Sequence, residues 1–151
     1  MKKVLLSLVC IAAIASLGAG RDVAQLEPVQ TVYLGMRDGY ICLQTDTGAW
    51  GVGDDVESTL KNTHQTTAAF VFLDTADYLL ITPELTHLLP SLQDLLRPSC
   101  RICLTADEPN LVYASTYLTI HKPAVTLKDY LAGERELPTL KTRGEGMQLV
   151  P

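Results

Sequence analysis

The segment that most constrains the fold runs from Ala68 to Arg97, where two short apolar runs lead into a leucine-rich stretch. Phe70 to Leu73 and Tyr78 to Ile81 are apolar at consecutive positions, which is typical of strands buried on both faces. Residues 74–77, which include two aspartates, predict a turn between these strands. Helices must then cover both faces of the sheet. We therefore expect an α+β protein with a mixed sheet of about four to five strands and helices packed on it.

The leucine-rich stretch predicts a helix that packs on this sheet. Thr82-Pro83-Glu84 predicts the start of this helix. The Thr82 hydroxyl can cap the first turn, and the N–H that Pro83 lacks would have no partner in the first turn. The negative charge of Glu84 is favourable near the positive end of the helix dipole. The leucines that follow recur at helical spacing: Leu85, Leu88, Leu89, Leu92, Leu95 and Leu96. Pro90 inside this stripe predicts a kink or two short helices that meet there, and Pro98 marks the end.

Upstream, two strand-like runs at 29–36 and 40–47 flank Asp38-Gly39, a dipeptide that favours a tight hairpin turn. Residues 48–53, GAWGVG, lack the Lys-Ser/Thr of a phosphate-binding loop, so we interpret them as a loop or bulge. Asp54 or Asp55 then caps a predicted helix from Val56 to Thr63, with Val56 and Leu60 on its inner face.

Downstream, Arg101 to Thr105 predicts a strand, and Asp107 with Pro109 predicts the start of a short helical turn. Thr116 to His121 alternates in polarity, which favours an edge strand. Thr126 to Ala132 predicts a helix with a capping box from Thr126 and Asp129, and Gly133 stops it. The tail from Glu134 is polar and predicts a linker.

Residues 1–20 have the composition of an export signal. Lys2 and Lys3 form a basic start, an apolar run extends from Val4 to Leu17, and Gly18-Ala19-Gly20 suits signal peptidase. A buried N-terminal helix or an uncleaved signal anchor are the alternatives. Cys10 does not fit a lipidation site, because Val9 stands where lipoprotein processing needs a small residue, so we interpret Cys10 as one more apolar residue of the signal.

Charge argues against a nucleic-acid partner. The chain has 12 Lys and Arg against 17 Asp and Glu, and cleavage after Gly20 leaves 10 basic residues and a net charge of −7. Binding to phosphates requires clustered Lys and Arg, and the sequence has no such cluster.

The length of 151 residues suits one domain with one core.

Cys100 and Cys103 match the redox spacing C-x-x-C. In the functional form the first thiol lies at a helix N-terminus, whereas here both lie at or in a predicted strand, where odd spacing sends the side chains to opposite faces. With Cys42 the exported chain has an odd number of thiols, which suits buried free cysteines better than a disulfide framework.

Other chemistry-bearing residues form no recognisable set. His64, His87 and His121 lack metal-site spacing, Ser91 and Ser115 lack a G-x-S-x-G context, and Asp74 and Asp77 fit a solvated turn. We therefore predict no catalytic residues, no cofactor-binding residues and no metal ligands, and we name no cofactor.

The order of these pieces from Arg21 to Leu140 resembles the N-terminal domain of the C-subunit family of spore germinant receptors, the GerAC-like lipoproteins. The pieces that carry the resemblance are Arg21-Asp22, VQTVYLG, VESTL, ADYLLITPEL, LQDLLR and RICLTA. In that family a lipidated cysteine precedes a short polar segment, a hairpin, a helix, an apolar strand, a helix pair closing on Leu-Leu-Arg, and a further strand. This sequence has Gly18-Ala19-Gly20 where the lipidated cysteine is expected.

The resemblance implies a non-enzymatic, exported subunit or domain of a spore germinant receptor complex that supports nutrient-triggered germination. Its partners would be membrane receptor subunits, and it would lie at the extracytoplasmic face of the spore inner membrane. Residues 21–140 would form the domain, and residues 141–151 a tail or the start of a following domain. The alternatives are a small secreted thiol oxidoreductase using Cys100 and Cys103, and a stand-alone extracytoplasmic ligand-binding module.

Overall fold

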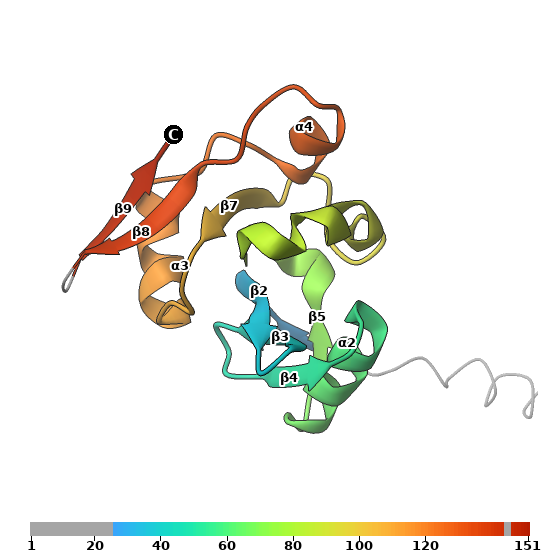
Figure 1. Ribbon diagram of the computed structural model, residues 1–151. Helices are drawn as coiled ribbons and strands as arrows, with labels where there is room; N and C mark the ends of the chain where they lie inside the picture. Colours follow the sequence, from blue (N-terminus) through green and yellow to red (C-terminus); the bar gives the residue numbers. More distant parts are fainter. Residues whose placement is uncertain (1–25, 144–145) are drawn as a thin grey trace, which may run out of the picture.

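The computed structural model describes residues 26–143 and 146–151 (Figure 1). The predicted export signal and Cys10 lie outside these residues. The fold is α+β, as predicted, but its main sheet has seven strands in the order β4-β3-β2-β6-β7-β8-β9 rather than four or five. These strands are β2 (Thr31–Arg37), β3 (Tyr40–Thr45), β4 (Trp50–Gly53), β6 (Tyr78–Ile81), β7 (Arg101–Thr105), β8 (Thr139–Arg143) and β9 (Gly146–Val150).

The centre of the sheet is parallel and its two ends are antiparallel. Strands β2, β6, β7 and β8 run in one direction, whereas β3 and β4 at one end and β9 at the other pair antiparallel. All four residues of β6 are buried, as the apolar run predicts for a strand covered on both faces. A separate parallel pair joins β1 (Leu26–Pro28) to β5 (Phe70–Phe72), and the 3₁₀ turn η2 (Leu73–Thr75) follows at the predicted bend.

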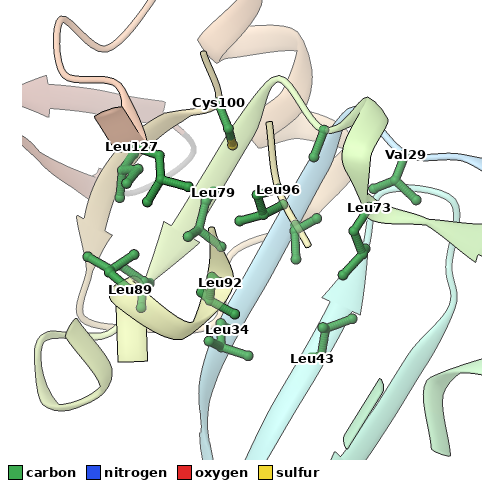
Figure 2. Packing of buried hydrophobic residues seen from close by; sticks show 14 of the residues in the cluster. Val29, Leu34, Leu43, Leu73, Leu79, Leu89, Leu92, Leu96, Cys100 and Leu127 are labelled. Carbon is green, nitrogen blue, oxygen red and sulfur yellow. The ribbon is translucent and has the colours of Figure 1, made fainter. Parts of the chain in front are cut away.

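Helices cover the two faces of the sheet unequally (Figure 1). On one face, α2 (Val56–Gln65), the 3₁₀ helix η3 (Pro83–Leu92) and α4 (Leu127–Leu131) contribute to the larger apolar cluster. Figure 2 shows this cluster, in which leucines of η3 and α4 meet those of β2, β3 and β6. On the other face, α3 (Leu111–Ile120) packs Leu111, Ala114 and Leu118 against a smaller cluster that includes Tyr33 and Leu80.

The hairpin between β2 and β3 is confirmed. Arg37 pairs with Tyr40 across a two-residue turn, in which Asp38 and Gly39 have φ of 53° and 85°. Positive φ at both central residues is the type I′ geometry, whose twist matches that of the flanking strands. The capping boxes of Asp55 with Ser58 and of Thr126 with Asp129 are also present, and Gly133, with φ of 73°, follows α4.

The prediction for residues 48–53 was wrong, because Trp50–Gly53 forms strand β4, which pairs with β3. Its glycines allow α2 to lie directly on the strand: a Cβ at Gly51 would be 2.7 Å from the carbonyl oxygen of Thr59. The face of α2 that is fully buried is therefore Thr59 and Thr63, while the predicted Val56 and Leu60 are only partly buried. Both threonine hydroxyls donate to carbonyl oxygens four residues earlier, so their burial leaves no donor unpaired.

Two predictions near the C-terminus were also wrong. Thr116 to His121 is not an edge strand, because α3 runs from Leu111 to Ile120 and is capped by Asn110, whose side chain accepts from the Tyr113 N–H. A window of six residues was too short to show the helical repeat of Leu111, Ala114, Ser115 and Leu118, which are the buried positions. The tail is not a linker, since β8 and β9 form a hairpin that extends the sheet beyond β7.

The leucine stripe is helical, but it is a 3₁₀ helix that continues through Pro90 without the predicted division at that residue. A 3₁₀ turn bonds each N–H to the carbonyl three residues earlier, and Pro90 simply lacks one such donor. Leu85, Leu89 and Leu92 are buried against the sheet, whereas Leu88 is only partly buried.

Candidate partner-binding face

One partly uncovered region of the sheet lies on the side of α3, over strands β2, β3 and β4, where Arg37, Tyr40 and Trp50 are exposed. Tyr33 packs in the smaller apolar cluster beneath α3, which we call the α3 cluster, so the alternation of side chains along β2 places Arg37 on the same side. Gln44 lies directly opposite Tyr33, and Trp50 opposite Gln44, which puts both on this side as well. We call this surface, together with the outer side of α3, the α3-side face.

A polar cluster joins the sheet to the start of α3. Glu108, which follows β7, pairs with Arg37 at 2.5 Å and accepts a hydrogen bond from the Gln44 side chain at 2.6 Å. Burial would raise the pKa of Glu108, but the hydrogen bonds from Gln44 and Arg37, with the charge of Arg37, hold it below its usual value. The cluster therefore keeps a carboxylate and a guanidinium, matched in charge, at the edge of the face.

Exposed apolar side chains lie on α3 and on the strands of this face. Helix α3, LVYASTYLTI, has no charged residue, and Val112, Tyr113 and Ile120 on its outer side are 66%, 55% and 72% exposed. On the sheet, Tyr40 and Trp50 are about half exposed, at 49% and 48%. A helix that carries large apolar residues outside its buried side as well as on it is commonly covered on more than one side. Large apolar groups that gather on one face, rather than lying singly, mark an interaction surface.

Two hollows lie along this face. The larger, of about 470 Å³, lies between α3 and the amino-terminal end of β2, and is lined by Gln30, Asp46, Val112, Ser115, Thr116, Thr119 and Ile120. The smaller, of about 210 Å³, is lined by Arg37, Gln44, Thr45, Gly48, Ala49 and Trp50. The face thus combines exposed apolar side chains with two hollows that polar side chains help to line.

The C-x-x-C cysteines lie on opposite sides of β7, as the odd spacing predicts. Cys100 belongs to the larger apolar cluster (Figure 2) and Cys103 to the α3 cluster, and both are free and fully buried. Burial raises the pKa of each thiol from 9.0 to about 12. Cys42, the third free thiol among the described residues, is also buried, and its pKa is raised by the same cause.

We expect all three thiols to react slowly with Ellman's reagent in the folded protein at pH 8, because the attacking thiolate is scarce and enclosed. In urea the same thiols should react at the rate of free cysteine. Stopped-flow absorbance with and without urea measures the two rates. A thiol of the folded protein that reacts as fast as free cysteine would contradict this expectation.

The raised pKa values of Cys100 and Cys103 also predict a pH dependence of stability. Above about pH 9 the thiols ionise in the unfolded chain but stay protonated in the folded protein, so the free energy of unfolding should fall as pH rises above about 9.

The remaining residues that the sequence singled out are dispersed. His64 contacts the Phe70 ring and the Val71 carbonyl, and His87 bonds to the Glu84 carbonyl. Asp77 pairs with Arg97, and Ser91 donates to the Leu88 carbonyl. Within residues 26–143 and 146–151, no three His, Cys, Asp or Glu side chains gather as a metal site. Ser115 alone among these residues enters a hollow of the α3-side face.

Sequence reasoning missed the residues that form the α3-side face. Glu108 lies 71 residues after Arg37 and 64 residues after Gln44, so no local motif connects it to them. Trp50 was visible in the glycine-rich stretch, but its exposure depends on β4 being an edge strand.

Comparisons with protein-family models, with curated proteins and with solved structures found no match to this chain. In the part of the chain that the structure describes, no helix has the length and apolar character that a membrane span requires.

Proposed function

We propose that this chain is a non-enzymatic, exported subunit or domain of a spore germinant receptor complex, acting at the extracytoplasmic face of the spore inner membrane. The observation that carries the proposal is the order of elements. Hairpin β2–β3, helix α2, apolar strand β6, helical segment η3 ahead of Leu-Leu-Arg, and strand β7 occur in this order along the chain, with β4 and β5 between them. This order resembles that of the GerAC-like family, although η3 is one segment where the family has a helix pair.

The α3-side face supports a role in binding a protein partner. It presents uncharged, partly aromatic surface on α3 and β4, and aromatic side chains with few charges are typical of interface centres. The thiol oxidoreductase alternative is disfavoured, because its two thiols are buried on opposite sides of the sheet. Membrane receptor subunits are the partners that the family resemblance implies.

A paired experiment in the native host tests the proposal. The tagged full-length protein should co-purify from membranes with polytopic receptor subunits, and its deletion should slow nutrient-triggered spore germination. If the protein is recovered only as a soluble monomer and its deletion leaves germination unchanged, the proposal is wrong.

Substitutions on two faces then test which surface binds. We expect Tyr113→Asp, at an exposed position of α3, to weaken co-purification at least about tenfold, because an aromatic anchor of an interface commonly contributes about 2 kcal/mol. Leu131→Asp, on the opposite side of the sheet in α4, is the matched control and should leave co-purification unchanged. Equal losses in the two variants would remove the α3-side face from the proposal.

A further inference from the structure

The larger hollow of the α3-side face is lined by both polar and apolar side chains. Asp46, which is half-buried, and Val112 and Ile120 of α3 are among them. Its volume of about 470 Å³ falls in the range of small-molecule sites, which span roughly 300 to 1,000 Å³. Asp46 is the only charged residue among its lining residues.

A network of hydrogen bonds fixes the Asp46 carboxylate. One oxygen accepts from the Gln30 backbone N–H at 3.2 Å, and the other lies 3.3 Å from the Ser115 hydroxyl. The single proton of that hydroxyl is shared with the Gln30 side-chain oxygen, which lies nearer at 2.9 Å, and the Gln30 amide nitrogen in turn donates to Thr119 at 3.3 Å. Because its neighbours are bonded to one another, the carboxylate is held in one orientation without help from a ligand.

The carboxylate retains unused capacity for hydrogen bonds. A carboxylate has about four lone-pair sites, and the contacts above use two of them. The ion pairs within residues 26–143 and 146–151 are Arg37–Glu108 and Arg97–Asp77, so Asp46 has no cationic partner there. A half-buried carboxylate that has no cationic partner, and that lines a hollow open to solvent, favours the binding of a cation from solution.

We infer that this hollow binds a protonated amine attached to a short apolar group, with the ammonium on Asp46 and the apolar group against Val112 and Ile120. The Ser115 hydroxyl, 3.3 Å from the carboxylate, and the Thr119 hydroxyl, which lines the same hollow, are the further oxygen acceptors available to the ammonium. The amine has two possible sources, a free small molecule or the lysine side chain of a partner protein. The hollow would recognise the ammonium whether or not the chain takes part in germination.

The test uses n-butylammonium as probe and n-butanol as its neutral counterpart. Titration of the ¹⁵N-labelled protein should give saturable amide shifts at Ser115 and Thr119 with n-butylammonium, with half-saturation on the order of millimolar for so small a ligand. n-Butanol at the same concentrations should give none. If n-butylammonium gives no saturable shift at these amides, the inference is wrong.

Two variants separate the contributions of charge and apolar contact. Asp46→Asn keeps an oxygen for the Gln30 N–H but removes the charge, and should weaken n-butylammonium binding about tenfold or more. Ile120→Ala removes an exposed apolar wall and should weaken it a few-fold. The matched control is Asp38→Asn at the hairpin turn, which removes the same charge at the far end of β3 and suits its positive φ. Unchanged binding in Asp46→Asn, or an equal loss in Asp38→Asn, would overturn the inference.

A competition experiment identifies the source of the amine. Nα-acetyl-lysine amide carries its ammonium on a peptide unit and should displace n-butylammonium if a partner's lysine is the natural occupant. Failure to displace it, with n-butylammonium still bound by the wild type and lost in Asp46→Asn, assigns the hollow to a free amine. Both results support an ammonium site.

Discussion

Gly51→Val is expected to unfold the protein or to lower its free energy of unfolding by about 3 kcal/mol or more. Overpacking usually costs about 1 to 3 kcal/mol, so this loss lies at or above the upper end of that range. A side chain at Gly51 would overlap the Thr63 backbone nitrogen and approach the Thr59 carbonyl oxygen of α2. Backbone atoms inside a helix cannot move aside individually, so either α2 leaves the sheet or β4 separates from β3. Urea unfolding followed by circular dichroism measures the loss.

Gly146→Ala is the matched control for this prediction. A Cβ at Gly146 would meet the Arg143 carbonyl oxygen at 3.6 Å, which is an ordinary contact, and its φ is not positive. We expect its free energy of unfolding to stay within about 0.5 kcal/mol of wild type, as for most surface substitutions. A Gly51→Val protein as stable as Gly146→Ala would show that α2 does not lie directly on β4.

Leu89→Ala is expected to lower the free energy of unfolding by about 3 kcal/mol, within the range of about 2 to 5 kcal/mol for leucine in a core. Leu89 is fully buried in η3, among leucines of β2, β6 and α4 (Figure 2). Neighbours held by two layers cannot collapse into the space that its side chain leaves, so a cavity remains. Chemical unfolding with an unchanged m-value would confirm a loss of stability without a change of fold.

Leu88→Ala removes the same atoms from the neighbouring position and serves as its control. Leu88 is only partly buried against the cluster, so we expect about 1 kcal/mol or less. The difference between the two variants reports which side of η3 faces the sheet. Equal losses would show that the helix is rotated from the orientation in which Leu85, Leu89 and Leu92 are the buried leucines.

Local signals in the sequence predicted several elements correctly. The Asp38-Gly39 turn, the helix cap predicted at Asp54 or Asp55 and formed by Asp55, and the capping box of Thr126 each depend on backbone geometry and hydrogen bonds within a few residues. The short apolar run at Tyr78 to Ile81 predicted a strand buried on both faces, because a run without polar residues leaves no side for water. Such signals need no knowledge of distant residues.

The errors arose where distant contacts outweigh local preference. Trp50–Gly53 is rich in glycine and predicted a loop, yet it is a strand because the glycines allow α2 to approach its backbone. Thr116 to His121 alternates in polarity, yet it is helical because Leu111, Ala114 and Leu118 bury one side of α3 on the sheet. The polar tail forms β8 and β9 because β7 offers an open edge for pairing.

The α3-side face could not be predicted from motifs. Its polar contacts join Arg37 and Gln44 to Glu108, and Gln30 and Asp46 to Ser115, across separations of 64 to 85 residues. Each of these side chains is ordinary in its local context. Only the placement of α3 beside β2 and β3 brings them together into a cluster and a hollow.

The sequence by itself determined the α+β class, the two-residue hairpin and the doubly buried strand β6, because periodicity and turn chemistry act over a few residues. Tertiary structure decided the number of strands, the course of η3 through Pro90 and the composition of the α3-side face. It also decided that the stretch from Ala68 to Arg97, which supplies β6 of the sheet and η3 on one face, forms only part of a larger core that strands and helices on both sides complete. Sheet edges and helix faces select partners by burial and backbone pairing, which depend on segments far apart in the chain.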